Sequence, residues 1–142
     1  MRVFKDKKLV IASHNKGKIT EIKDLLETLD HSVRDLATHV CLSGGKRIRP
    51  FLLYNCGVGK ASTEDLLKAS AVIELIHVAT LVHDDILDSA SIRRGKATLH
   101  SKCGDYPAIL LGDALFSFAL ELATDFPSTK ICKIVSTATR KT

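Results

Sequence analysis

One long apolar segment, residues 63–88, constrains the fold more than any other part of this sequence. Its apolar side chains fall on every side of a helix: Val72, Ile73, Leu75, Ile76, Val78, Leu81, Val82, Ile86 and Leu87. A helix that is apolar nearly all round is buried in the middle of a bundle. Ser62 or Thr63 can cap it, and Glu64 and Asp65 suit its first turn. The segment therefore predicts a central helix in an all-α domain.

The rest of the chain from His31 onward also has helical spacing. The apolar pattern predicts helices over 33–41, 50–56 and 107–124, and a last one from Thr129 to the end. Pro50 suits the first turn of a helix, where its missing N–H does no harm. Residues 89–104 are polar and read as a loop. No later segment looks like a strand.

The first 29 residues have a different pattern. Lys8–Ser13 is a short apolar run that predicts a strand, and a polar turn with Gly17 follows it. Residues 19–29 then have helical spacing. A single strand without a partner is anomalous in a helical protein. We therefore expect a strand–loop–helix unit over 1–29 and a helical domain over 30–142.

Composition excludes several classes of protein. Apolar residues make up 45% and charged residues 26%, so the chain is not disordered throughout. Aromatic residues make up only 5%, which is few for stacking against the bases of a single strand. The net charge is +5, but the sequence contains no motif that binds a groove of DNA or RNA, so we expect no nucleic-acid partner. No uninterrupted apolar run reaches about 18 residues and no secretory signal is evident, which favours a cytoplasmic protein without a membrane span. The four cysteines form no CxxC pair and are expected to be free thiols.

Acidic residues lie within the apolar segment at helical spacing. Glu74, His77, Asp84 and Asp88 form one stripe, and Asp85 lies beside it. Polar groups on a buried helix are costly unless they are paired, and three carboxylates within five residues repel one another. Oxygen ligands favour a hard cation, above all magnesium held by carboxylates and substrate phosphates. The alternative is a solvated acidic helix end, which the apolar surroundings disfavour.

Two basic clusters accompany the aspartates. Gly44–Pro50 places Lys46, Arg47 and Arg49 behind two glycines at a helix start, and Arg93-Arg94-Gly95-Lys96 follows the acidic stretch. Either cluster alone is most often a solvated surface run. Together with an aspartate site they predict a polyanionic ligand that metal bridges on one side and cations bind on the other. A diphosphate fits this description.

The ordered motifs GGKRIRP, ELIHVATLVHDDILD, RRGKATLH and AILLGDALFSFALELA resemble the trans-type polyprenyl (isoprenyl) diphosphate synthase family over about residues 32–140. The resemblance implies an all-α isoprenoid-synthase bundle that condenses an allylic prenyl diphosphate with isopentenyl diphosphate. It makes Asp84, Asp85 and Asp88 the magnesium ligands and, with Arg93, the catalytic residues. It also implies that Arg93 contacts the allylic diphosphate. Isopentenyl diphosphate would be held by Lys46, Arg49, His77 and Arg94.

The sequence departs from that family in length. Members are roughly twice as long and carry a second aspartate-rich motif, which these 142 residues lack. We therefore expect a partial bundle with little or no elongation activity of its own, acting as a homodimer or with a missing C-terminal half. Ala79 and Thr80, just before Asp84, are small, which by the resemblance implies a product longer than a farnesyl chain. The alternative is that these small residues only pack a neighbouring helix.

Residues 1–28 resemble a second family. KLVIASHNKGKITEIKDLL is similar to the opening of the house-cleaning nucleoside triphosphate pyrophosphatases, which would place Ser13, Asn15 and Lys18 near a triphosphate. Two alternatives to the synthase thus stay open. In the first alternative the chain is a remnant of a nucleotide pyrophosphatase. In the second it is a non-catalytic fragment that binds a partner through its apolar helix faces.

Overall fold

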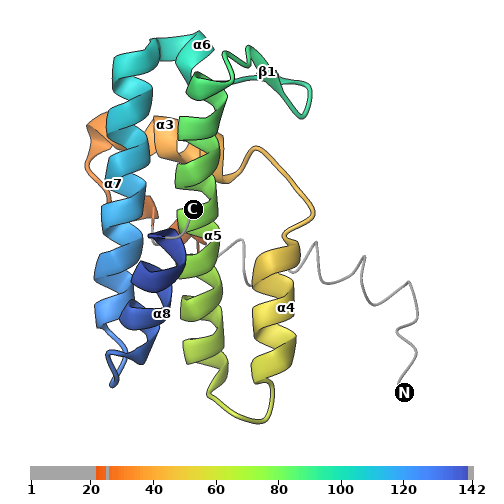
Figure 1. Ribbon diagram of the computed structural model, residues 1–142, viewed down its shortest axis with the longest axis vertical. Coiled ribbons are helices and arrows are strands. Elements are labelled where there is room, and N and C mark those ends of the chain that lie inside the picture. The colour runs from red at the N-terminus through yellow and green to blue at the C-terminus, as the bar shows by residue number, and fades with distance from the viewer. Residues whose placement is uncertain (1–21, 25, 141–142) are drawn as a thin grey trace. The chain divides into compact units, whose positions relative to one another are not determined.

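The computed structural model describes residues 22–24 and 26–140, and these residues are predominantly helical (Figure 1). The chain divides into two units, Met1–Glu74 and Leu75–Thr142, each of which is described by itself. The boundary falls within one long helix, α5, which spans Thr63–Leu87. The expected strand at Lys8–Ser13 and the candidate nucleotide residues Ser13, Asn15 and Lys18 lie outside the described residues.

The first unit contains helix α3 (His31–Cys41), helix α4 (Ile48–Gly57) and the first half of α5. Ser62 caps α5 as expected: the Asp65 N–H donates to its Oγ at 3.0 Å, and that hydroxyl donates to Asp65 Oδ2 at 2.8 Å. The Ser70 hydroxyl donates to the Pro50 carbonyl at 3.3 Å and joins α5 to α4. The buried apolar side chains of this unit are Ile22, Leu26, Ala37, Cys41, Leu66, Ala71 and Val72.

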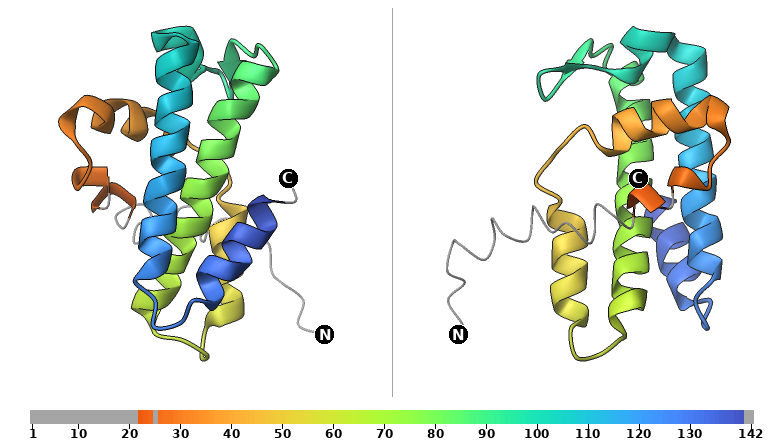
Figure 2. Two further views of the ribbon diagram at one scale, coloured as in Figure 1. Left: turned by 60° about the vertical axis from the view of Figure 1, so that its left-hand side comes forward. Right: turned by 180° about the vertical axis from the view of Figure 1, so that it is seen from behind.

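The second unit contains the other half of α5 and the helices α6 (Leu99–Cys103), α7 (Asp105–Thr124) and α8 (Lys130–Thr139). In it α7 runs beside α5 in the opposite direction (Figures 1 and 2). Their shared core is apolar and includes Leu75, Val78, Ala79, Val82, Ala108, Leu111, Leu115 and Ala119. The Cys132 thiol of α8 donates to the Ala123 carbonyl of α7 at 3.1 Å. The helices expected over 33–41, 50–56, 63–88, 107–124 and from 129 are therefore confirmed, each within a few residues.

The prediction that residues 89–104 form only a loop was wrong. Strands β1 (Ile92–Arg93) and β2 (Lys96–Ala97) pair antiparallel, with Arg93 opposite Lys96, and α6 follows them. The two turn residues have positive φ, 52° at Arg94 and 74° at Gly95, which is the backbone of a two-residue hairpin turn. Strands of two residues show no alternation of polar and apolar positions, so sequence pattern could not reveal them.

Two helices, α5 and α7, are long and apolar enough to cross a membrane by length and composition. The expectation of no membrane span rested on the absence of a long uninterrupted apolar run. The two helices meet a criterion of length and mean hydropathy that allows up to two charged residues in the apolar window. The core helix of a soluble protein passes the same test, and 50% and 39% of the two apolar windows are buried within the protein. Length and composition are by themselves weak evidence for a span. All four cysteines are free, as expected.

Candidate functional site: an aspartate turn and a basic hairpin

The three aspartates near the end of α5 differ in exposure. Asp84 and Asp88 are exposed, whereas Asp85 is only 6% exposed. The Asp88 N–H donates to the Asp84 carbonyl at 2.8 Å, so the helical turn continues through both residues. Residues four apart on a helix share one face. Two carboxylates therefore lie one turn apart on an exposed face, and the third points into the protein.

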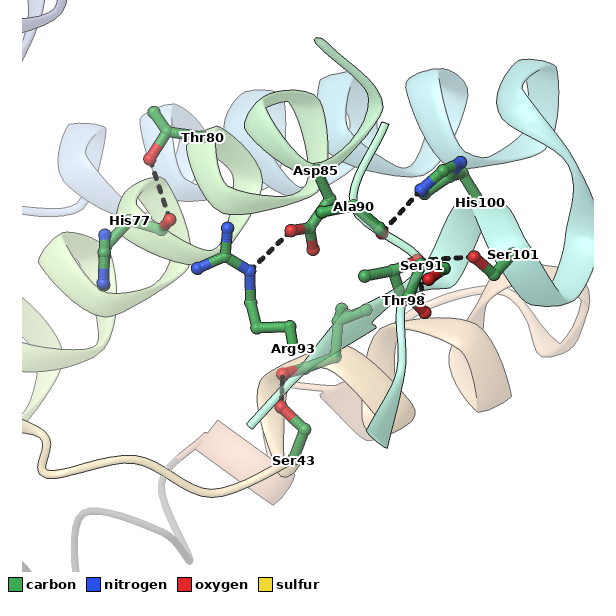
Figure 3. A network of polar contacts seen from close by, with 11 residues as sticks. Ser43, His77, Thr80, Asp85, Ala90, Ser91, Arg93, Thr98, His100 and Ser101 are labelled. Carbon is green, nitrogen blue, oxygen red and sulfur yellow. Dashed lines mark hydrogen bonds and ion pairs between the residues drawn. The ribbon is translucent and has the colours of Figure 1, made fainter. Parts of the chain in front are cut away.

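The buried carboxylate is paired with the hairpin. Arg93 on β1 donates from Nε to Asp85 Oδ1 at 2.6 Å (Figure 3). The Asp85 side chain is 9% exposed and that of Arg93 is 36% exposed. A charge-assisted bond of this kind holds the guanidinium in place while much of it still meets solvent. The structure thus pairs Asp85 with Arg93, a contact that the sequence did not predict.

His100 holds the hairpin segment to the end of α5. Its Nε2 lies 2.9 Å from the Ala90 carbonyl (Figure 3). Its Nδ1 lies 3.1 Å from Asp105 Oδ1. Both partners are acceptors, so both ring nitrogens donate when the imidazole is protonated. The bond to Ala90 and then the bond to Asp105 raise the pKa of His100 above its ordinary value of 6.5. His100 lies in the RRGKATLH motif, but sequence reasoning gave it no role.

Thr98 strengthens the same segment. Its N–H and its hydroxyl both bond to the Ser91 carbonyl, at 3.0 Å and 3.3 Å, and the hydroxyl also lies 2.8 Å from Ser101 Oγ (Figure 3). Thr98 is only 3% exposed, so these bonds are sheltered from water. Residues 89–104 are thereby an ordered support for Arg93.

His83 ties the turn before Asp84 to α7. Its Nε2 lies 3.3 Å from the Ile109 carbonyl and 3.5 Å from Asp113 Oδ1. Gly112 makes this approach possible, because a Cβ there would lie 2.2 Å from the same nitrogen. This pair was also missed from sequence. The only available signal was a glycine inside an otherwise apolar helix pattern.

The remaining predicted residues of the second unit are His77 and Arg94. His77 is half-buried, and its carbonyl accepts the Thr80 hydroxyl at 2.8 Å (Figure 3). Arg94 is exposed at the hairpin turn. Ala79 is only 1% exposed, which favours the alternative that this small residue serves packing. The prediction of a long product stays a prediction.

In the first unit, Lys46 and Arg49 are exposed, as expected for cations that meet a ligand. Arg47 between them is different. It forms an ion pair with Glu74 and donates to the Cys41 carbonyl, and the two side chains of the pair are 11% and 8% exposed. Glu74 was grouped with the aspartates as one acidic stripe. The ion pair with Arg47 supplies the partner that a polar group on a buried helix needs.

The aspartate turn offers two exposed carboxylates to a metal ion. Among residues 22–24 and 26–140, no group of three or more His, Cys, Asp or Glu side chains is arranged to hold a metal ion. Asp85 bonds to Arg93 and does not join Asp84 and Asp88. Two exposed carboxylates one turn apart nevertheless fit magnesium, which is held by one or two carboxylates together with substrate phosphates.

Comparison with known proteins decides the family. The polyprenyl synthetase family model matches residues 30–142. The chain belongs to the polyprenyl synthetase family. It is 38% identical over 132 residues to the short chain isoprenyl diphosphate synthase of Methanocaldococcus jannaschii, covering 87% of this chain and 40% of that protein. It is 42% identical over 88 residues to heptaprenyl diphosphate synthase component 2 of Geobacillus stearothermophilus, covering 61% and 28%.

Solved structures of polyprenyl synthetases show the same fold. The crystal structure of polyprenyl synthase from Caulobacter crescentus, complexed with calcium and isoprenyl diphosphate, matches with a TM-score of 0.84 and 32% identity. The match covers 99% of this chain and 44% of that one. The all-α isoprenoid-synthase fold is thus confirmed. The chain spans 34–40% of the length of the curated relatives first matched. The nucleotide pyrophosphatase alternative finds no support among these proteins.

Proposed function

We propose that this chain serves a magnesium-dependent prenyltransferase of isoprenoid biosynthesis, which condenses an allylic prenyl diphosphate with isopentenyl diphosphate. One observation carries the proposal: within one unit, exposed Asp84 and Asp88 stand one helical turn apart, and the neighbouring Asp85 holds Arg93. Carboxylates that can bind a hard cation and a guanidinium that can bind phosphate are the two components that a metal–diphosphate ligand needs.

The aspartates have divided roles in this proposal. Asp84 and Asp88 hold magnesium, which when bound neutralises the charge of the departing diphosphate. Asp85 orients Arg93 toward the diphosphate oxygens. Arg93 binds Asp85 through Oδ1, so Oδ2 is the oxygen that would act as a third metal ligand. The chain's own contribution is therefore to bind and orient the allylic diphosphate for loss of its leaving group.

The roles in isopentenyl diphosphate binding follow from the family resemblance. Lys46, Arg49, His77 and Arg94 bind the diphosphate of that substrate. Lys46, Arg49 and Arg94 are exposed cations, which supports the assignment, and His77 is half-buried. In this proposal residues 30–142 form the N-terminal half of a polyprenyl synthetase helical domain, and the family match over the same residues supports it.

The assembly and location are also proposals. These 142 residues contain no second aspartate-rich motif, so the activity is expected to need a second set of residues. A second copy or a separate C-terminal half would provide a partner, and one relative is itself named as a component 2. The cytoplasm is the proposed location.

A chimera tests this function. Residues 30–142 would replace the corresponding part of the Methanocaldococcus jannaschii synthase, and labelled isopentenyl diphosphate with geranyl diphosphate and magnesium would report elongation. We expect labelled product, reduced about a hundredfold or more by Asp88→Ala because several kcal/mol of charge stabilisation are lost. Lys133→Ala, at an exposed position on α8, is the matched control. A folded chimera that makes product equally well with Asp88→Ala contradicts the proposal.

A further inference from the structure

Arg47 has an unusual backbone for its residue type. Its φ is 48° and its ψ is 39°, in the left-handed region, which is unfavourable for a residue with a side chain. It precedes α4 directly, and its carbonyl accepts the Phe51 N–H at 3.1 Å in the first turn. A strained residue persists only when its surroundings hold it there. The side chain of Arg47 supplies such a constraint.

One guanidinium joins three helices of the first unit. Nη1 of Arg47 pairs with the Glu74 carboxylate on α5, and Nη2 donates to the carbonyl of Cys41, the last residue of α3. The backbone of Arg47 itself begins α4. The planar fork of arginine can make two such bonds at fixed angles, which a lysine cannot.

Neighbouring residues at the end of the α3–α4 loop and in the first turn of α4 differ in exposure. Lys46 and Arg49 are exposed, while the Arg47 side chain is 11% exposed and Pro50 is buried. Gly44 and Gly45, with φ of 92° and 136°, precede these residues and leave the backbone many alternatives. The inward anchor at Arg47 therefore determines which way its two cationic neighbours point.

We propose that Arg47 and Glu74 are positioning residues for isopentenyl diphosphate, which hold the α3–α4 loop and the first turn of α4 so that Lys46 and Arg49 are presented to the diphosphate. This inference rests on the proposed function, in which Lys46 and Arg49 bind that substrate. Arg47 itself does not contact the substrate. Replacing a buried ion pair by apolar residues often preserves stability, so a pair of this kind is better explained by positioning than by stability alone.

Cys41 provides an independent report on the loop. Its side chain is 1% exposed, and burial raises the pKa of its thiol to about 12. Cys56 in the same unit is exposed. Because the Cys41 carbonyl accepts from Arg47, release of the anchor should expose the end of α3 and speed alkylation of Cys41 relative to Cys56.

The experiment compares three variants of the full 142-residue chain with the wild type. Glu74→Gln breaks the pair, the double variant Arg47→Met with Glu74→Leu replaces it by apolar groups, and Glu27→Gln is the matched control. Glu27 pairs with Arg34 at 3.2 Å in the same unit but is 72% exposed. Calorimetry measures isopentenyl diphosphate and, separately, geranyl diphosphate with magnesium. Peptide mass spectrometry measures alkylation of Cys41 against Cys56.

We expect Glu74→Gln and the double variant to weaken isopentenyl diphosphate binding about tenfold or more, with geranyl diphosphate binding unchanged within about twofold. Cys41 alkylation should rise in both, and Glu27→Gln should match the wild type. Equal loss of both ligands, an unchanged isopentenyl diphosphate affinity in the folded double variant, or weaker binding without faster alkylation would each overturn the inference. A wild type that binds neither ligand would instead overturn the proposed function, and the alkylation would still decide whether Arg47 holds the loop.

Discussion

Among the residues that the structure describes, each unit contains one arginine–carboxylate pair with a nearly buried carboxylate, yet the two pairs differ in their arginine. The carboxylates of Glu74 and Asp85 are similarly buried, at 8% and 9% exposure. Arg47 is 11% exposed and Arg93 is 36% exposed. An arginine that is closed off from water can act only on the protein, whereas one that still meets solvent can share its donors with a phosphate. Burial therefore separates an anchoring arginine from a ligand-binding one.

The backbones at the two arginines support the same distinction. Arg47 itself occupies the left-handed region, so the strain lies at the anchor. Arg93 lies in a strand, and the positive φ falls on Arg94 and Gly95 at the turn beyond it. In the second unit the turn at Arg94 and Gly95 positions Arg93 toward solvent. In the first unit the side chain of Arg47 holds its own backbone and the α3–α4 loop in place.

The largest expected effect tests the difference in burial directly. Glu74→Gln should destabilise the chain by about 3 kcal/mol, because Arg47 is left as a buried charge without its partner. Asp85→Asn should cost only about 1 kcal/mol, since much of Arg93 stays solvated. Urea unfolding followed by circular dichroism measures both. Equal losses of stability in Glu74→Gln and Asp85→Asn would show that the burial of the arginine does not distinguish the Arg47–Glu74 pair from the Arg93–Asp85 pair.

The affinity for geranyl diphosphate should depend on Arg93, whereas the Arg47→Met, Glu74→Leu double variant should leave it unchanged. Arg93→Ala should weaken geranyl diphosphate binding by about 2 kcal/mol, or some thirtyfold, because a charge-assisted bond to the diphosphate is lost. Calorimetry with magnesium present measures this change, and Arg94→Ala on the neighbouring turn is the control. A thirtyfold loss for both would mean that the hairpin contributes only general positive charge.

A smaller effect should come from the packing that supports the aspartate turn. Gly112→Ala places a Cβ against the ring of His83, which must then swing away and give up the Ile109 carbonyl. We expect a loss of about 1 kcal/mol in stability and a similar loss in magnesium-dependent ligand binding. Ser117→Ala, at an exposed position on α7, should change neither. Unchanged binding in Gly112→Ala would show that His83 does not help to place Asp84.

The smallest effect should be a dependence of stability on pH through His100. Its pKa is raised in the folded protein by the Ala90 carbonyl and by Asp105, so the protonated form is favoured by folding. This stabilisation is complete below the ordinary value of 6.5 and is lost as the pH rises through the higher folded pKa. Urea midpoints between about pH 6 and pH 8 should fall for the wild type and fall less for His100→Gln. Parallel curves for the two proteins would contradict this assignment.

Much of this architecture could be predicted from sequence because the signals were local. The helices follow from apolar spacing, and the Ser62 cap follows from a hydroxyl two residues before Glu64. Aspartates four apart necessarily share a face, so Asp84 and Asp88 were recognised together. Motif order was sufficient to indicate the family, which the family match over residues 30–142 then established.

The rest depends on contacts that a linear pattern does not encode. Helical spacing placed Glu74 on one stripe with Asp84 and Asp88, but it did not reveal that Glu74 pairs with Arg47, 27 positions away. Asp85 was expected as a metal ligand, and only the hairpin geometry reveals its bond to Arg93. His83 and His100 likewise acquire their roles from backbone carbonyls, which every residue has and no motif distinguishes.

The central claim is that Asp84 and Asp88 bind magnesium together with an allylic diphosphate that Arg93 also contacts. Calorimetric titration of the 142-residue chain with geranyl diphosphate, in magnesium and in EDTA, tests it most directly. The account predicts binding in magnesium, little or none in EDTA, and loss of the magnesium dependence in Asp84→Ala and Asp88→Ala. Binding of equal strength in magnesium and in EDTA would contradict the account.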